Sequence, residues 1–503
     1  MAINYLEKIL TARVYDVAKE TPLELAEKLS QRLGSEVLFK REDLQPVFSF
    51  KLRGAYNKIY QLSLQQELKT VVAASAGNHA QGVALAAQRL GIKSIIVMPK
   101  TTPRIKVEAV QAYGAKIVLK GDSYDDACEH AYTIAEKQQA PFIHPYDDPD
   151  VIAGQGTIAV ELLRQCQQGI DAIFVPIGGG GLAAGIAAYV KAIKPGIKII
   201  GVEPEEAASM HGALAANRRI TLKQVGIFAD GVAVKQVGKE TFRLCKQHLD
   251  DMILVSTDEI CAAIKDIYDD TRSIAEPAGA VATAGIKKYV AEQGWQGKRV
   301  ISLVCGANMN FDRLRHVSER AEIGEQREML LGVTIPEHPG SFKKFCADLG
   351  KRSITEFNYR YADDARAHVF AGVELSGAEE KAKLLKQLKA KGYELQDLSD
   401  NEMAKLHIRY MVGGCQQNVG RERLFRFEFP ERPGALQTFL STLGRRWNIS
   451  LFHYRNHGSA NGRVLVGLQI DKQDDVNFKA FLKDLAYEFA EETDNPAYAM
   501  FLA

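Results

Sequence analysis

Short apolar runs alternate with helix-length amphipathic segments between residues 71 and 308. Stretches such as 80–90 and 104–113 carry apolar residues at helical spacing, which predicts helices. Alternation of this kind is typical of crossover connections, so we expect an α/β region with mostly parallel sheets covered by helices. Ligands in such folds bind outside the carboxyl ends of the strands. Buried strands are predicted at 71–74, 94–98, 116–119, 172–177, 198–202, 252–255 and 300–304.

A different pattern begins after a charged segment at 322–328 and then repeats itself. Residues 335–342 align with residues 429–436 at an offset of 94 positions, as from Gly340 to Gly434. Each copy has the pattern strand, Pro-Gly turn, helix, strand, strand, helix, which predicts an α+β module with helices on one face. The register continues at Phe345/Phe439, Leu349/Leu443 and Gly350/Gly444 and, after a one-residue slip, at Phe357/Phe452, Tyr359/Tyr454, Arg360/Arg455, Val369/Val464 and Gly372/Gly467.

These patterns divide the chain into parts. We expect one α/β domain at 1–321, a linker or neck at 322–328, and two similar small domains at 329–415 and 416–503. A chain of 503 residues is long enough for domains of these sizes.

Composition narrows the class of protein. Hydrophobic residues make up 46% and charged residues 25% of the chain, as in a soluble globular protein. The net charge of +2 is spread along the chain without a basic stripe, which argues against nucleic acid as a partner. The apolar stretches are too short to span a bilayer, and residues 1–30 do not have the pattern of a signal or transit peptide. Seven scattered cysteines without Cys-x-x-Cys spacing argue against disulfides and zinc, so we expect a cytoplasmic protein.

Lys51 is the first candidate for chemistry. Most lysines are solvated surface residues, but Phe48, Phe50 and Leu52 give this one an apolar setting. Desolvation would lower the pKa of its amine and free the nucleophilic form, which can condense with an aldehyde.

Four consecutive glycines, Gly178 to Gly181, lie between a predicted strand and a helix that begins near Leu182. A tight turn needs one or two glycines, whereas four allow several backbone N–H groups to converge on an anion at a helix N-terminus. A dinucleotide site is a rival, but the loop is far from the first strand and has no suitably placed acidic partner. We therefore favour a phosphate site.

Two further segments follow predicted strands. Ser75-Ala76-Gly77-Asn78-His79 can offer N–H groups to a carboxylate, and Asn78 can hydrogen-bond a phenolic oxygen. Ser75 and Asn78 could equally cap the following helix, and His79 taken alone favours a structural role. Cys305 ends another strand, where it is either a small buried hydrophobe or a weak partner for a ring nitrogen that stays unprotonated.

Five motifs together resemble the fold-type II pyridoxal-phosphate enzymes and, among them, the biosynthetic threonine deaminases (threonine ammonia-lyases). The resemblance covers nearly the whole chain and implies two open parallel-sheet subdomains followed by paired ACT-like regulatory domains. The motifs are Ser49-Phe-Lys-Leu-Arg-Gly-Ala, Ser75-Ala-Gly-Asn-His-Ala-Gln-Gly, Gly178-Gly-Gly-Gly-Leu-Ala-Ala-Gly, Glu276-Pro-Ala-Gly-Ala and Cys305-Gly-Ala-Asn.

The resemblance implies a lyase that deaminates L-threonine, and also L-serine, to a 2-oxo acid and ammonia, the first step of isoleucine biosynthesis. Lys51 would bind pyridoxal 5′-phosphate covalently and then remove the α-proton. Phe50 would pack on the cofactor ring, Asn78 would bond its 3′-oxygen and Cys305 would face its nitrogen. The remaining implied contacts are Gly178, Gly179, Gly180, Gly181 and Leu182 for the phosphate, and Ser75, Ala76, Gly77 and His79 for the substrate.

Departures from related enzymes sharpen the prediction. Many relatives have Ser where Cys305 stands, although some serine dehydratases also have Cys. Serine racemases resemble this chain but place a second Ser at the position of Ala76, where it serves as the opposite-face base, so elimination is favoured here. The cation site of serine racemases requires an acidic residue at the position that Ser209 occupies here, after Glu203. We therefore expect no metal site.

The repeat implies regulation, with isoleucine as feedback inhibitor and valine as antagonist. Tyr359 and Tyr454 match the family's effector-site tyrosines, although repeated core aromatics would give the same pattern. The family also suggests a homotetramer. Alternatives are a serine dehydratase, serine racemase or threonine synthase on the same scaffold, and a non-enzymatic amino-acid sensor. The tandem module argues against the first group, and the intact Lys51, Asn78 and glycine loop argue against the sensor.

Overall fold

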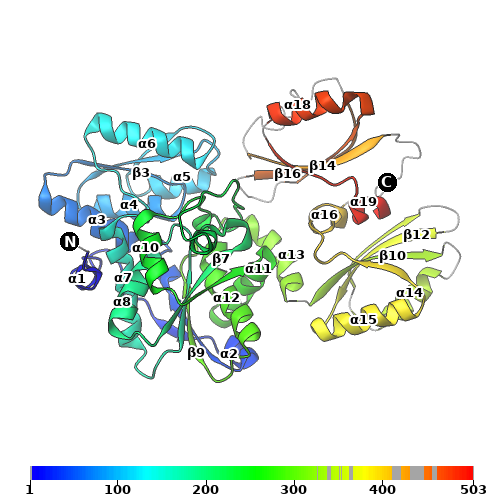
Figure 1. Ribbon diagram of the computed structural model, residues 1–503, viewed down its shortest axis with the longest axis horizontal. Coiled ribbons are helices and arrows are strands. Elements are labelled where there is room, and N and C mark those ends of the chain that lie inside the picture. The colour runs from blue at the N-terminus through cyan, green and yellow to red at the C-terminus, as the bar shows by residue number, and fades with distance from the viewer. Residues whose placement is uncertain are drawn as a thin grey trace. The chain divides into compact units, whose positions relative to one another are not determined.

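The computed structural model describes residues 3–325, 327–336, 341–350, 352, 354–361, 366–410, 421–430, 447–455, 461–485 and 487–501. The chain forms two compact units, Met1–Ala321 and Glu322–Ala503 (Figure 1). Helix α13 (Arg313–Gly324) runs across this boundary, and strand β10 (Glu328–Pro336) begins soon after it.

The larger sheet of the first unit has six strands in the order β1-β2-β9-β6-β7-β8. Strand β1 is antiparallel to β2, and all the other pairs are parallel. The strands are β1 (Leu23–Leu25), β2 (Glu36–Arg41), β6 (Ala172–Pro176), β7 (Lys198–Pro204), β8 (Asp251–Val255) and β9 (Arg299–Val304).

The smaller sheet has three parallel strands, β3 (Thr70–Ala74), β4 (Lys93–Met98) and β5 (Lys116–Leu119). Successive strand residues point to opposite faces, so Val71 and Ala73 pack against one set of helices and Val72 and Ala74 against another. All seven predicted strands are present, and the predicted fold class is correct.

Helices surround both sheets of the first unit (Figure 1). They are α1 (Tyr5–Leu10), α2 (Glu27–Leu33), α3 (Lys51–Gln65), α4 (Asn78–Arg89), α5 (Arg104–Gln111), α6 (Tyr124–Gln138), α7 (Pro149–Gln165), α8 (Gly181–Ile193), α9 (Ser209–Ala215), α10 (Lys239–His248), α11 (Thr257–Thr271) and α12 (Pro277–Gln293). Short 3-10 turns occupy Glu42–Leu44, Glu205–Ala207 and Asp230–Val232.

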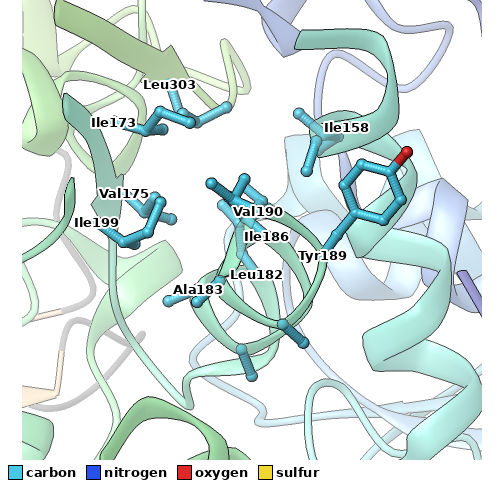
Figure 2. Packing of buried hydrophobic residues seen from close by; sticks show 14 of the residues in the cluster. Ile158, Ile173, Val175, Leu182, Ala183, Ile186, Tyr189, Val190, Ile199 and Leu303 are labelled. Carbon is cyan, nitrogen blue, oxygen red and sulfur yellow. The ribbon is translucent and has the colours of Figure 1, made fainter. Parts of the chain in front are cut away.

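Helix α8, which follows the four glycines, packs directly on the larger sheet. Figure 2 shows Ile186 and Val190 of this helix turned toward Ile173, Val175 and Ile199 of the central strands. The helix reads almost entirely Ala, Gly, Ile, Leu and Val, and residues 181–190 are all buried. An apolar helix of this kind fixes the position of the loop at its N-terminus.

A fully buried network of charged side chains anchors α3. Arg53 donates to Glu42 at 2.8 Å and to Glu161 at 2.6 Å, and Lys40 donates to Glu161 at 2.6 Å. All four side chains are 0% exposed. The two cations and two carboxylates balance, which is the condition under which charges are tolerated in a protein interior. Sequence patterns did not predict β2, in which Lys40 belongs to this network rather than to solvent.

The second unit contains two four-stranded antiparallel sheets of the same topology, β11-β12-β10-β13 and β15-β16-β14-β17. The first has β10, α14 (Ser341–Leu349), β11 (Ile354–Tyr361), β12 (Arg366–Glu374), α15 (Ala378–Ala390), β13 (Glu394–Asp397) and α16 (Glu402–Leu406). The second has β14 (Glu422–Pro430), β15 (Asn448–Arg455), β16 (Asn461–Gln469), α18 (Asp475–Leu485), β17 (Glu488–Glu491) and α19 (Pro496–Phe501). Turns at Ile408–Tyr410 and Lys472–Asp474 complete the described elements.

The repeat predicted from sequence is therefore a structural repeat, down to an irregularity. The pairing of β11 with β12 shifts between Ile354 and Glu356, and that of β15 with β16 shifts between Ile449 and Leu451. These β-bulges correspond at an offset of 95 positions, so the one-residue slip of the sequence alignment lies just before them, after Gly350 and Gly444. Each copy also has a fourth strand, β13 or β17, that the predicted pattern lacked.

The two copies of the repeat share one hydrophobic cluster. It contains Leu330 and Phe370 from the first copy together with Leu424 and Leu465 from the second. Residues next to them along the same strands, such as Leu331 and Phe425, point to the opposite face and join the separate core of each copy. Both faces of each sheet are thus buried in part by apolar contacts.

Candidate active site

The candidate residues lie at strand ends, as the parallel-sheet rule predicts. The segment from Ser75 follows β3, the four glycines follow β6 and Cys305 follows β9. Ser49 forms a β-bridge with Gly306, and Phe50 N donates to Cys305 O at 3.3 Å. These contacts bring the residues just before Lys51 against the end of β9.

Lys51 is the first residue of α3, and its amine is held inside the site. Nζ donates to the carbonyl oxygen of Pro145 at 3.3 Å and lies 5.4 Å from the centre of the Phe50 ring. Burial lowers the pKa of Lys51 to about 8, although the nearby Cys305 and Glu276 oppose this shift. The neutral share of the amine at neutral pH is therefore much larger than for an ordinary lysine, and the neutral form is the one that acts as nucleophile or base.

The glycine loop presents free N–H groups at the start of α8. The backbone nitrogens of residues 178–182 donate to no described group, and all but Gly178 belong to buried residues. Gly180 has a φ of +94°, and a Cβ on Gly179 would lie 2.2 Å from the Tyr146 ring. Buried N–H groups without partners are rare in proteins, and here they converge at a helix N-terminus. The loop therefore fits a phosphate group.

The start of the helix after β3 excludes one of the roles considered for Asn78, that of a helix cap. Helix α4 begins at Asn78, its capping residue is Gly77, and no side chain caps it. The interpretation of Asn78 as a capping residue is therefore wrong. Ser75 Oγ accepts a hydrogen bond from Gly77 N at 3.2 Å. A Cβ on Gly77 would meet nothing within 4 Å, so there is open space beside this loop.

His79 is buried and serves the packing of this loop. Its Nε2 lies 2.8 Å from the carbonyl oxygen of Ile143, to which it donates as a neutral ring. Burial, together with the charge of Lys51, lowers the pKa of His79 to about 3. The imidazole therefore stays neutral at physiological pH and ties α4 to the residues before Pro145.

Cys305 is 3% exposed, and its Sγ donates to the carbonyl oxygen of Ala278 at 3.3 Å. Burial raises the pKa of this thiol, and the Glu276 carboxyl raises it further. The side chain is consequently a neutral thiol, too weak an acid to protonate a neighbouring ring nitrogen.

Several residues that complete the site were not predicted from the sequence. Asn78 donates to Glu276 at 2.5 Å and accepts from Asn308 at 2.7 Å. Both partners lie in motifs that identified the family, but the sequence did not suggest their roles. Thr241 Oγ1 supports the glycine loop by donating to Gly179 O at 2.7 Å. Pro145 takes part through its backbone carbonyl, for which no side-chain signal exists.

Glu203, which sequence comparison placed at the cation site of serine racemases, has protein partners here. Its carboxylate accepts hydrogen bonds at 2.8 Å from the backbone nitrogens of Met210 and His211. Burial raises the pKa of Glu203 to about 8. Among the described residues, no group of three or more His, Cys, Asp and Glu side chains is arranged to hold a metal ion.

Tyr359 and Tyr454 have equivalent backbone positions in the two copies of the repeat. Tyr359 pairs with Val369 across β11 and β12, and Tyr454 pairs with Val464 across β15 and β16. The side chains of both tyrosines lie outside the described part of the structure, so their assignment as effector residues stays a prediction.

Comparison with known proteins identifies the family. Residues 14–306 match the family described as pyridoxal-phosphate dependent enzyme. Residues 319–408 and 413–502 each match the C-terminal regulatory domain of threonine dehydratase. The chain is 56% identical to the L-threonine dehydratase biosynthetic IlvA of Burkholderia multivorans over 99% of both chains. The chain belongs to the biosynthetic threonine dehydratase family. The resemblance inferred from the motifs is confirmed, and the protein is a pyridoxal-phosphate-dependent enzyme.

Solved structures agree with a little under two thirds of the chain. The processed form of threonine deaminase isoform 2 from Solanum lycopersicum is 53% identical, with a TM-score of 0.62 over 63% of this chain and 88% of that chain. Maize serine racemase is 34% identical, with a TM-score of 0.59 over 62% of this chain and 96% of that chain. Among the residues described here, no helix is both long and apolar enough to cross a membrane.

Proposed function

We propose that this enzyme deaminates L-threonine, with L-serine as a second substrate, by α,β-elimination of water. Hydrolysis of the product then gives 2-oxobutanoate and ammonia from threonine. The observation that carries the proposal is the buried amine of Lys51, whose pKa is lowered and which contacts Pro145, while the glycine loop with its free N–H groups packs against the next residue, Tyr146. Similarity along the whole chain to a threonine dehydratase, including the regulatory domains, favours threonine over the serine racemase alternative.

Pyridoxal phosphate, when bound, supplies an aldehyde that links to amino groups and a ring that withdraws electrons from the α-carbon. The backbone N–H groups of Gly178 to Leu182 bind its phosphate at the start of α8. Asn78 would direct an amide group to its phenolic oxygen, and Phe50 would pack against its ring. The neutral thiol of Cys305 would face its ring nitrogen and is too weak an acid to protonate it.

Lys51 Nζ would hold the cofactor through its aldehyde, and the same amine would take the α-proton of the substrate. A pKa of about 8 suits both roles, because the amine gains and loses a proton near working pH. Ala76 offers no group that could deliver a proton from the opposite side, so elimination is favoured over racemisation. The loop of Ser75, Ala76 and Gly77, beside which there is open space, receives the substrate carboxylate, with His79 fixing the loop from beneath.

The test is the Lys51→Ala variant of the full-length protein. We expect it to lose both the yellow colour of the bound cofactor and the formation of 2-oxo acid from threonine and serine. Lys69→Ala, at a side chain 79% exposed, is the matched control and should keep both. A wild-type protein that stays colourless after incubation with pyridoxal phosphate would overturn the proposal.

We infer that the second unit binds isoleucine as inhibitor and valine as its antagonist, through the region of Tyr359 and Tyr454. The regulatory-domain matches over residues 319–408 and 413–502 support a regulatory role. Deleting residues 326–503 removes most of that unit and should leave threonine deamination while abolishing its inhibition by isoleucine. A truncated enzyme that isoleucine still inhibits would contradict the inference.

We also propose a cytoplasmic homotetramer. Five cysteines in the described residues are free thiols, as suits a reducing compartment. Light scattering should give four times the 55.5 kDa mass of the chain. A dimeric or monomeric mass at working concentration would be contrary evidence.

A further inference from the structure

Three side chains from separate segments meet beside Lys51. Asn78 begins α4, Glu276 immediately precedes α12, and Asn308 lies four residues beyond the end of β9. The Asn78 amide nitrogen donates to Glu276 Oε1 at 2.5 Å, and the Asn308 amide nitrogen donates to Asn78 Oδ1 at 2.7 Å. The side chain of Asn78 is thus held at both ends of its amide group.

A backbone carbonyl determines which way these amides point. Asn308 Nδ2 also donates to the carbonyl oxygen of Val47 at 2.9 Å. Because a carbonyl only accepts hydrogen bonds, the NH₂ group of Asn308 must face Val47, and its second hydrogen is given to Asn78 Oδ1. The carbonyl end of Asn78 is therefore occupied, and its NH₂ end must face Glu276.

The NH₂ group of Asn78 has two hydrogens, and only one has a protein partner. Among the described residues, Glu276 alone accepts a hydrogen bond from this nitrogen. The second N–H is left for a ligand. If the Asn78 amide were reversed, its carbonyl oxygen rather than an N–H would face the ligand.

Gly306 makes room for this arrangement. A Cβ at Gly306 would lie 2.2 Å from Glu276 Oε1 and 3.2 Å from the Asn78 amide nitrogen. The same glycine accepts a hydrogen bond from Glu276 N at 3.0 Å through its carbonyl oxygen. The requirement for glycine at this place follows from the packing of Glu276 rather than from a turn, since Gly306 does not have a positive φ.

Charged groups around Glu276 keep it an acceptor. Its carboxyl is 4% exposed, and burial raises its pKa to about 7, with the Asp230 charge adding to the shift. The Asn78 amide, Lys106 and Arg313 favour the ionised form. Lys106 forms an ion pair with Asp230 at 2.5 Å. In either protonation state Oε1 can accept from Asn78, because a carboxyl group retains acceptor capacity when protonated.

We propose that Asn308 and Glu276 are positioning residues that fix the polarity of the Asn78 amide, so that an N–H and not a carbonyl faces the phenolic oxygen of the cofactor. This inference rests on the proposed function, in which Asn78 faces that oxygen. An N–H donor favours the ionised phenolic oxygen, whereas a carbonyl oxygen would favour the protonated one. The ionisation state of the bound cofactor is therefore determined in part by Asn308.

The decisive variant is Asn308→Asp in the full-length holoenzyme. A carboxylate at this position cannot donate to Asn78 Oδ1, so the Asn78 amide turns to donate to it. The ratio of the visible absorbance band of the cofactor (ionised phenolic oxygen) to the near-ultraviolet band (neutral oxygen) should then fall about tenfold at fixed pH, since a hydrogen bond to a charged group is lost. The dissociation constant of pyridoxal phosphate should rise by about the same factor.

Two further variants distinguish the effect of the Asn78 amide orientation from the effects of an added charge and of misfolding. Asn310→Asp places the same new charge two residues along the segment, where Oδ1 accepts from Asp312 N, and should leave the band ratio unchanged. Glu276→Gln keeps an acceptor oxygen for Asn78 and removes a negative charge, so its band ratio should stay equal or rise. Glu276→Gln also keeps the proposal testable if the Asn308→Asp variant proves insoluble.

An unchanged band ratio and cofactor affinity in Asn308→Asp would overturn the proposal, as would an equal fall in Asn310→Asp or a fall in Glu276→Gln. These outcomes leave the proposed function standing, provided that the wild-type protein binds the cofactor through Lys51. A wild-type protein without bound cofactor would instead refute the proposed function itself.

Discussion

Replacing Arg53 with methionine should destabilise the first unit strongly. The guanidinium makes hydrogen bonds to Glu42, to Glu161, to Thr157 and to the carbonyl oxygen of Lys19. A methionine side chain is of similar length, but it cannot donate hydrogen bonds. The variant would leave two carboxylates facing one remaining cation, Lys40, in a region with 0% exposure.

The magnitude follows from that uncompensated charge. Removing one partner of a buried ion pair costs about 3–5 kcal/mol in free energy of unfolding. An unfolding entropy of about 2.1 cal/mol/K per residue gives a unit that ends at residue 321 about 0.7 kcal/mol/K. The Tm of this unit should therefore fall by about 4–7 °C.

The loss should also depend on pH. Burial opposes ionisation of Glu161, but the charge of Arg53 overcomes it and holds the pKa of Glu161 below its ordinary value. Without Arg53 that pKa rises, so at low pH the carboxyl takes a proton and the unpaired charge disappears. The decrease in Tm should be larger at pH 8 than at pH 5.

The assay is thermal unfolding of the holoenzyme, followed by loss of the visible cofactor absorbance, which reports on the first unit. Arg104→Met is the matched control, because Arg104 pairs with Glu108 on the surface at 91% and 55% exposure. Its effect should stay within about 0.5 kcal/mol. If Arg53→Met lowered Tm by no more than this control, the reasoning from the buried network would be refuted.

Three other outcomes are expected at the cofactor site. Gly179→Ala should weaken cofactor binding about tenfold or more, measured by equilibrium dialysis, because a Cβ would lie 2.2 Å from the Tyr146 ring; unchanged affinity would contradict this. The rate of cofactor capture by the apoenzyme should rise through pH 8 and then level off, as Lys51 loses its proton; a rate that still climbs at pH 10 would show an unperturbed lysine. Cys305→Ser should retain activity within about tenfold in a 2-oxo acid assay, since a hydroxyl can also donate to Ala278; a complete loss would argue against this equivalence.

The parallel-sheet architecture and the repeat could be predicted because their signals are local and periodic. Apolar runs such as 172–177 must be buried on both faces, whatever surrounds them. Strand β2 was not predicted because Lys40 and Arg41 read as solvent-facing residues. The carboxylate that pairs with Lys40 is Glu161, more than a hundred positions away, so the sequence around β2 does not reveal that Lys40 is buried. Strand β13 is short and polar, so its place in the sheet follows from pairing with β10 rather than from its own sequence.

The candidate site shows the same division. Lys51 and the glycine loop could be predicted from the sequence, because their residue types and spacing are distinctive. Asn78 was ambiguous between a capping role and a ligand role. The start of α4, where Gly77 is the capping residue and no side chain caps the helix, excludes the first role, and the second stays a proposal. The carbonyl of Pro145 could not be inferred, because every residue carries one and only the fold determines which carbonyl faces the amine.

The hydrophobic cluster shared by the two repeats affects how the second unit unfolds. Because Leu330 and Phe370 are covered by side chains of the other copy, neither copy can unfold without exposing its partner's apolar face. We therefore expect the duplicated modules to unfold as one cooperative unit, a single foldon built from two similar halves. Amide hydrogens of β10 and β14 should exchange with the same free energy of opening, and a ligand that stabilises one half should protect both.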